Sequence, residues 1–154
     1  MHKYLWIFFV SILFTACSNN AEVNMQSVDG VWNKKQELQF KLNIQDPEVP
    51  KNIIFIVRNN NEYPYSNIYI MSSIKEEKQK EIKIDTLNYL LAKPNGEWIG
   101  TGFGETKEVQ LQYKSNFYFP KKGTYIIGIK QAMRANPLVG IEDVGVRIEN
   151  TTQP

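Results

Sequence analysis

The sequence has little of what catalytic and metal-binding sites commonly use. Its 154 residues include one cysteine, Cys17, and one histidine, His2. A single cysteine excludes an intramolecular disulfide and a multi-cysteine metal site. Because the only histidine is the second residue, catalysis based on histidine and a histidine-ligated zinc site are nearly excluded. We therefore predict no cofactor and no metal site.

A surplus of one charge sign is also missing. Lys and Arg together number 18 and Asp and Glu 16, which gives a formal charge of +2. A protein that holds nucleic acid by electrostatic attraction shows a basic stripe or tail, so no nucleic-acid partner is expected. The length fits one domain, and the 42% of apolar residues is enough for a hydrophobic core.

No apolar run is long enough to cross a membrane as a helix. The longest, residues 5–14 (LWIFFVSILF), falls short of the roughly 20 residues that a spanning helix needs. It follows a short basic start and fits the apolar core of a secretory signal peptide. We expect residues 1–16 to be a signal peptide that is removed.

Small residues then lead to Cys17. The segment Phe14-Thr15-Ala16-Cys17 resembles the lipobox of bacterial lipoproteins, although Phe14 stands where leucine is common. In such proteins the cysteine thiol receives a diacylglycerol, so we predict lipidation of Cys17 and membrane attachment through that lipid. The alternative is an ordinary signal peptide followed by an incidental cysteine. Residues 18–31 are polar and lack clear periodicity, so residues 17–31 are predicted to be a lipidated cysteine with a flexible tether.

From Trp32 onward the chain alternates between apolar and polar residues with the period of strands. A short helical turn is considered only for residues 130–136, and turn residues separate the alternating runs. About eight strands with regular turns predict an all-β fold for residues 32–154, a single antiparallel β-sandwich of immunoglobulin-like or jelly-roll topology. The strands are expected at residues 38–44, 52–58, 68–72, 82–91, 98–99, 109–113, 125–129 and 144–148.

Two polar segments could suggest ligand sites but have simpler interpretations. Residues 100–104 (GTGFG) depart from the G-x-G-x-x-G of dinucleotide-binding loops and precede a strand, which favours a bulged or tightly packed strand. Residues 75–83 (KEEKQKEIK) mix both charge signs, as a solvated hairpin end does, and lack the spacing of a calcium loop. No two acidic residues stand out as a glycosidase pair.

The aromatic residues offer two candidate surfaces. Trp32 and Trp98 could stack on sugar rings, although most aromatics of an all-β domain fill the core. Residues 63–67 (YPYSN) join two predicted strands, and the proline limits the freedom of the loop. Tyr63, Tyr65 and Asn67 are therefore candidate residues for docking a partner. In the alternative interpretation, the tyrosines only cover the end of the sandwich.

Three segments together resemble a known family. They are residues 57–71 (VRNNNEYPYSNIYIM), 85–105 (DTLNYLLAKPNGEWIGTGFGE) and 123–149 (GTYIIGIKQAMRANPLVGIEDVGVRIE). With the lipobox, they resemble the gliding-motility lipoprotein H family of the Bacteroidota. The resemblance implies an envelope lipoprotein needed for gliding and tied to type IX secretion, and it brings no catalytic residue.

The resemblance therefore implies a membrane-anchored, non-enzymatic accessory or scaffold whose partners are proteins of the gliding and secretion machinery. The alternative is a glycan-binding β-sandwich lipoprotein of the outer membrane, which exposed aromatics on one face would indicate. In this phylum, acidic residues just after the cysteine favour export to the cell surface. Residues 18–20 (SNN) carry none, so the periplasmic face of the outer membrane is expected.

Overall fold

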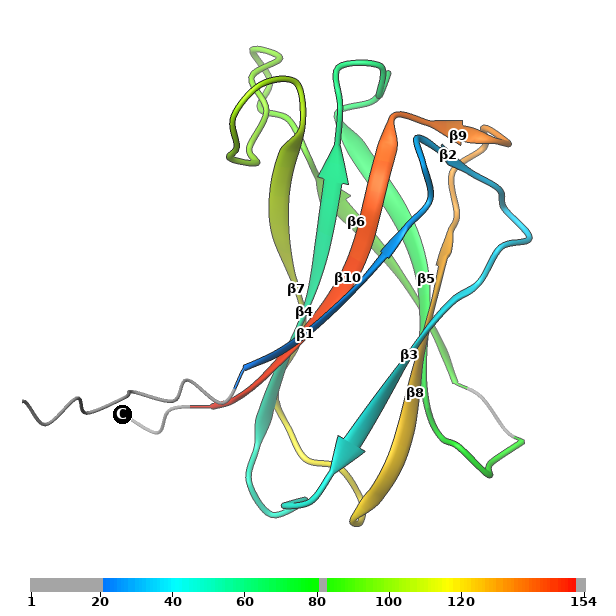
Figure 1. Ribbon diagram of the computed structural model, residues 1–154, viewed down its shortest axis with the longest axis vertical. Helices are drawn as coiled ribbons and strands as arrows, with labels where there is room; N and C mark the ends of the chain where they lie inside the picture. Colours follow the sequence, from blue (N-terminus) through cyan, green and yellow to red (C-terminus); the bar gives the residue numbers. More distant parts are fainter. Residues whose placement is uncertain (1–20, 81–82, 152–154) are drawn as a thin grey trace, which may run out of the picture.

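The computed structural model describes residues 21–80 and 83–151, and in these residues every regular element is a β-strand (Figure 1). Every pair of neighbouring strands is antiparallel, so the prediction of an all-β antiparallel fold is confirmed. The strands are β1 (Glu22–Ser27), β2 (Val31–Trp32), β3 (Leu38–Ile44), β4 (Lys51–Asn59), β5 (Asn67–Glu76), β6 (Ile84–Leu90), β7 (Lys107–Phe117), β8 (Gly123–Gln131), β9 (Leu138–Val139) and β10 (Ile141–Asn150).

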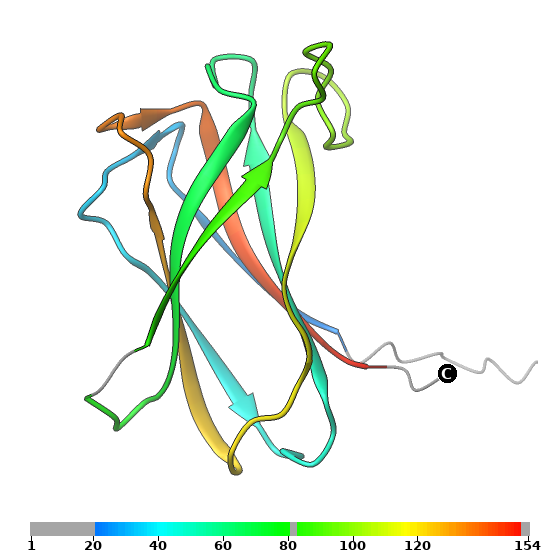
Figure 2. The same cartoon turned by 180° about the vertical axis from the view of Figure 1, so that it is seen from behind.

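Two four-stranded sheets face each other, as both views show (Figures 1 and 2). Their strand orders are β1-β10-β4-β7 and β3-β8-β5-β6, and the short pair β2-β9 lies at one end. The first long strand pairs with the last, while β1 and β3 belong to different sheets. An immunoglobulin domain keeps its first two strands in one sheet, whereas this order is that of a jelly roll.

Most long strands lie where the alternation predicts them, but two short predictions are wrong. Trp98 forms only an isolated bridge with Ala92, because the chain changes partner directly afterwards and Thr101 pairs with Glu108. Residues 130–136 contain no helical turn, since the first two end strand β8 and the rest are irregular. The Met133 amide and the Ala135 carbonyl bond instead to the side chain of Gln131. These two backbone groups therefore do not need hydrogen bonds within a helix.

The predicted tether is wrong from Glu22 onward. Residues Glu22–Ser27 form β1 and pair with β10 from Glu22 opposite Ile148 to Ser27 opposite Asp143. Strand β1 is an edge strand with half-buried and exposed side chains, so it shows no clear alternation. Its Gln26 side chain also donates a 2.8 Å hydrogen bond to the Gln39 carbonyl of β3, which ties the two sheets together. Residues 1–20, including Cys17, lie outside the described part of the chain.

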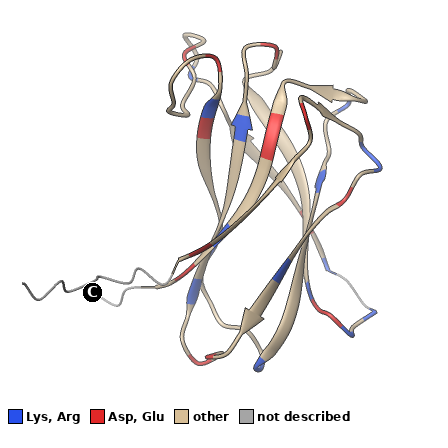
Figure 3. Ribbon diagram, in the orientation of Figure 1, with Lys and Arg blue, Asp and Glu red and all other residues tan. Residues whose placement is uncertain are grey.

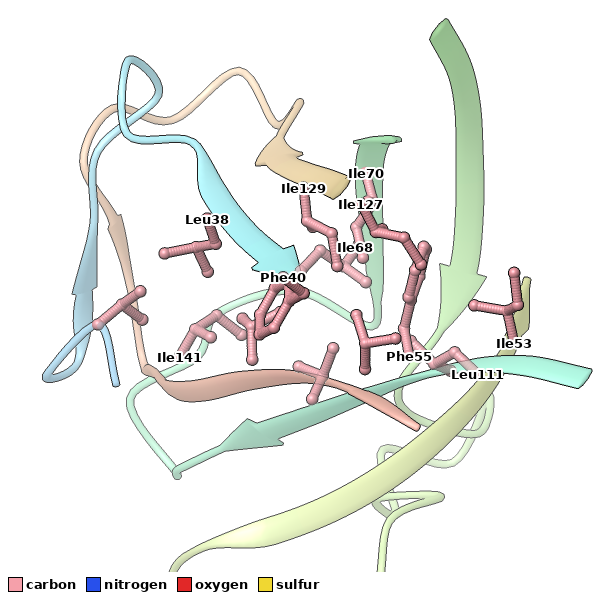
Figure 4. Packing of buried hydrophobic residues seen from close by; sticks show 14 of the residues in the cluster. Leu38, Phe40, Ile53, Phe55, Ile68, Ile70, Leu111, Ile127, Ile129 and Ile141 are labelled. Atoms are coloured by element: carbon pink, nitrogen blue, oxygen red, sulfur yellow. The ribbon is translucent and has the colours of Figure 1, made fainter. Parts of the chain in front are cut away.

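The hydrophobic core fills the space between the two sheets (Figure 4). Strand β3 alternates strictly between buried and exposed residues, whereas the central strands β4, β8 and β10 each contain three consecutive buried residues. Phe40 and Phe55, from opposite sheets, are both fully buried in this layer. Since burial of apolar surface contributes about 25 cal/mol per Å², this layer is the main source of stability.

A polar seam joins β6 to β7 along one open side of the sandwich. The Asp85 carboxylate accepts hydrogen bonds from the Tyr113 hydroxyl at 2.9 Å and from Lys114 Nζ at 2.8 Å. The hydrogen bond from Lys114 is the largest cause that lowers the pKa of Asp85. Nearby, the Tyr89 hydroxyl donates to the Gln112 carbonyl at 2.9 Å, and burial raises the pKa of Tyr89 to about 12. The seam fixes the spacing of the two edge strands.

Candidate functional site

The loop that carries the predicted docking residues lies at one end of the sandwich (Figure 1). The connection from β4 to β5 (residues 60–66) meets there with residues 91–106, which join β6 to β7, and with residues 132–140, which follow β8. We call these three segments the loop end. Strand β1 starts near the opposite end, since Glu22 lies beside Ile148 and Ile148 beside Ile53.

Tyr63 packs inside the loop end and offers no contact area to a partner. Its side chain is 3% exposed and its hydroxyl donates a 2.7 Å hydrogen bond to the Asn67 carbonyl. Burial raises the pKa of this hydroxyl well above its usual range. Gly140, at φ +82°, lies directly against the Tyr63 backbone. The prediction of Tyr63 as a docking residue is therefore wrong. The Y-P-Y pattern alone does not show which of the two tyrosines turns inward.

The two other predicted docking residues differ from each other. Tyr65 is 38% exposed, and its ring lies edge-on to the ring of Tyr63, with centroids 5.7 Å apart. Asn67 is half-buried, and its side-chain amide donates a 2.7 Å hydrogen bond to Asn88 Oδ1 on the neighbouring strand β6. Tyr65 thus remains a candidate for partner contact, whereas the Asn67 amide already links two strands.

Tyr65 lines a cleft that the sequence analysis missed. Its other lining residues are Tyr69 of β5 and Ala132, Met133 and Arg134, which follow β8, and its volume is about 460 Å³. Tyr69 occupies an outward position between the buried Ile68 and Ile70, so the alternation of β5 already indicated its exposure. The irregular segment after β8 gave no comparable signal.

Hydrogen bonds of a buried side chain hold this cleft in shape. Gln131 is 1% exposed; its Oε1 accepts from the Met133 amide at 2.9 Å, and its Nε2 donates to the Ala135 carbonyl at 3.0 Å. The Ala132 amide donates to the Tyr69 carbonyl at 2.8 Å, and the Tyr69 amide to Met133 Sδ at 3.2 Å. Since these groups are satisfied within the protein, the cleft walls are built before any partner arrives.

The aromatics proposed for sugar stacking do not form an exposed platform. Trp32 is fully buried, and its indole N–H donates to the Gln36 carbonyl at 3.2 Å. Trp98 is half-buried against the core, with its ring centroid 6.4 Å from that of Tyr63. Among these two tryptophans and the two tyrosines of the 63–67 loop, only Tyr65 is exposed. The geometry thus gives the glycan alternative little support.

The glycine-rich segment 100–104 folds back on the start of β7 instead of forming a strand. Thr101 pairs with Glu108 through two backbone hydrogen bonds of 2.9 and 2.8 Å. A Cβ at Gly100 would lie 2.8 Å from the Glu108 carbonyl oxygen, and one at Gly102 2.6 Å from that of Thr106. The expected tight packing is therefore present, and it leaves Phe103 at the tip fully exposed.

Charges of both signs are interspersed over the sandwich (Figure 3). Across one sheet, Arg58 of β4 lies 2.8 Å from Glu108 and 3.5 Å from Asp143. Within residues 21–80 and 83–151, no group of three His, Cys, Asp or Glu side chains could hold a metal ion. The same residues contain no helix that could span a membrane.

Fold and site together define a class of protein: a small jelly-roll domain with tyrosine and aliphatic side chains around a preformed cleft at one end. The chain belongs to the GldH lipoprotein family, whose model matches residues 21–148. The resemblance drawn from the sequence is thereby confirmed. As a family of lipoproteins, it consists of membrane-anchored proteins of the cell envelope.

Two relatives match over nearly their whole length. The gliding motility lipoprotein GldH homolog of Christiangramia forsetii is 39% identical, covering 96% of this chain and 94% of its own. The gliding motility lipoprotein GldH of Flavobacterium johnsoniae is 36% identical, covering 90% of this chain and 89% of its own. A solved structure of infectious bursal disease virus, Gx strain, covers 86% of this chain and 33% of its own at 10% identity, with a TM-score of 0.33.

Proposed function

We propose that the protein is a lipid-anchored, non-enzymatic accessory of the gliding and type IX secretion apparatus that works by binding other proteins of that machinery. The names of the two relatives support the role in gliding motility. The observation that carries the binding role is the gathering of exposed apolar side chains in and beside the loop end. They are Val31, Tyr65, Tyr69, Leu90, Ile99, Phe103 and Val139.

This distribution favours a protein partner for a physical reason. Exposed apolar side chains that are scattered singly are normal, whereas their concentration on one surface marks an interaction site. Tyrosine is enriched in such sites because it supplies contact area together with a polar tip. Tyr65, Ile99 and Phe103 lie on loops, and the other four side chains lie on strands beside them. The rigid sandwich therefore holds this surface in place, which is how binding loops are commonly presented.

The anchor in this proposal is the lipid on Cys17, after removal of residues 1–16, and its place is the periplasmic face of the outer membrane. The family name supports lipidation, and the absence of acidic residues from the SNN segment at 18–20 supports the periplasmic face. Labelled palmitate should enter the wild-type protein and not the Cys17→Ala variant. Equal labelling of both would contradict lipidation at this residue.

Complementation tests the function as a whole. In a gliding relative whose own copy is deleted, expression of this chain should restore spreading on agar. The Cys17→Ala variant, produced at an equal level, should not restore it, because the domain is no longer held at the membrane. Failure of the wild-type protein to restore spreading, although it is present in the membrane fraction, would contradict the proposed role.

A further inference from the structure

We propose that the cleft lined by Tyr65, Tyr69, Ala132, Met133 and Arg134 binds a protein segment in which a carboxylate lies beside an aromatic or aliphatic side chain. This inference rests on the proposed function, because it takes the partner at the loop end to be a protein. It adds the chemistry by which that partner is recognised. The argument uses the walls of the cleft, its charge and its rigidity.

The walls of the cleft suit an apolar side chain. Tyr65 and Tyr69 are 38% and 42% exposed, so their rings are available for contact. Met133 and Ala132 complete the apolar lining, and Met133 is a fixed part of it because it is buried and its Sδ accepts a hydrogen bond from the Tyr69 amide. A volume of about 460 Å³ lies within the range of roughly 300–1,000 Å³ common for small-ligand pockets. One aromatic side chain with its backbone fits such a space.

The charge of the cleft determines which kind of charged group can bind beside that apolar side chain. Arg134 is exposed and, within the described residues, takes part in no ion pair. By contrast, Arg58 lies 2.8 Å from Glu108 and Arg147 lies 2.6 Å from Glu149. A free guanidinium beside apolar walls complements a carboxylate, which arginine can bind with two parallel hydrogen bonds.

The rigidity of the cleft lowers the cost of binding. Gln131 fixes the backbone on both sides of Arg134 through Met133 and Ala135, so this segment need not reorder when a partner arrives. Other occupants fit less well. One arginine is too little charge for a nucleic acid. Strand β10 of the same chain ends away from the cleft, since Asn150 lies beside Lys51.

Three small probes with the same aromatic ring test the proposal. They are N-acetyl-L-phenylalanine, which carries a carboxylate, neutral N-acetyl-L-phenylalaninamide and cationic L-phenylalaninamide. The full-length protein in detergent micelles is titrated with each, and amide chemical shifts are followed by NMR. The acid should shift the amides of residues 65, 69 and 132–134 and bind roughly five-fold tighter than the neutral amide, as expected for one partly exposed charged pair. The cation should bind most weakly.

Matched variants distinguish specific binding in the cleft from non-specific binding elsewhere on the protein. Arg134→Gln should abolish the preference for the acid, and Tyr69→Ala should weaken the binding of all three probes. The controls are Lys122→Gln and Tyr118→Ala, exposed residues at the opposite end of the sandwich, and both should bind as the wild type does. The absence of shifts at the cleft, equal affinity for acid and neutral amide, or a preference that survives Arg134→Gln would each overturn the proposal.

The complementation assay keeps this proposal distinct from the proposed function. If the wild-type chain restores gliding but shows no preference for the acid, the proposed function stands and the cleft proposal is overturned. If the chain prefers the acid but does not restore gliding, the cleft proposal stands and the proposed role in gliding is overturned. Self-association of the wild type that Arg134→Gln abolishes would make a second copy the occupant and overturn the choice of a separate partner protein.

Discussion

At the residue scale, Gly140 supports the loop end by having no side chain. Its φ of +82° is unfavourable for other residues, and a Cβ there would overlap the backbone of Tyr63. We expect Gly140→Ala to lower the free energy of unfolding by about 3 kcal/mol or more, because backbone strain and overpacking add. Gly96 is the matched control, since it has φ +86° but a Cβ there would have no atom within 4 Å apart from those of the adjacent residues. Gly96→Ala should cost only about 1–2 kcal/mol. Urea unfolding measures both, and equal losses would contradict the contact with Tyr63.

The same scale shows what a sequence can reveal about a site. The position of Tyr69 follows from the alternation of β5, because Ile68 and Ile70 on either side of it must face the core. The roles of Tyr63 and Tyr65 do not follow, since a proline lies between them and no period assigns either to a face. Arg134 is part of an irregular segment shaped by the buried amide of Gln131, a contact that no local pattern encodes.

At the scale of elements, the seam between β6 and β7 makes stability depend on pH. The pKa of Asp85 is lowered, mainly by the hydrogen bond from Lys114, so the folded state favours the charged form. Stability from this group is present above the unfolded-state pKa of 3.8 and is lost as the pH falls through the lower folded-state value.

We therefore expect Asp85→Asn to reduce the free energy of unfolding at neutral pH and to flatten its decline below pH 3.8. Denaturant unfolding at a series of pH values measures this effect. Asp46→Asn, in the exposed turn between β3 and β4, serves as the control and should follow the wild-type profile. An Asp85→Asn profile that runs parallel to the wild type would show that the seam does not respond to pH.

Strand β1 allows a second test at this scale. Its pairing with β10 predicts that the amides of Glu22–Ser27 that point toward β10, every second one in this edge strand, exchange hydrogen far more slowly than those of a loop. Hydrogen-exchange mass spectrometry on the full chain can compare this segment with residues 102–106, which include the exposed Phe103. If both exchange equally fast, residues 22–27 behave as a tether in solution and the pairing is not maintained.

The elements also show where periodicity stops being informative. The long strands were predicted because each buries one or both faces, as the strict alternation of β3 illustrates. Strands β2 and β9 have two residues each, which is too few to show a period. The choice between immunoglobulin-like and jelly-roll topology depends on which distant strands pair, and β1 lies beside β10 from the far end of the chain. Such pairing arises from packing of the whole sandwich.

At the scale of the whole molecule, the jelly roll separates the start of β1 and the end of β10 from the loop end. Because the first long strand pairs with the last, Glu22 and Ile148 lie side by side (Figure 1). Ile53 of β4 lies next to Ile148. From there β4 continues for six residues to Asn59, a length of about 20 Å, before the loop end begins. A lipid on Cys17 would attach only four residues before Ala21, a reach of about 14 Å.

This geometry predicts how the anchored protein sits on a membrane. Cys17 is the sole cysteine and the proposed lipid consumes its thiol, so a cysteine introduced elsewhere is a unique labelling site. Phe103→Cys at the loop end and Tyr118→Cys between β7 and β8 replace two exposed aromatics at opposite ends of the sandwich. On lipidated protein in vesicles, we expect spin-labelled lipid headgroups to quench a fluorophore at residue 118 more strongly than one at residue 103. With Cys17→Ala both should stay unquenched. Stronger quenching at residue 103 would show that the loop end faces the membrane, which would contradict its availability to a partner protein.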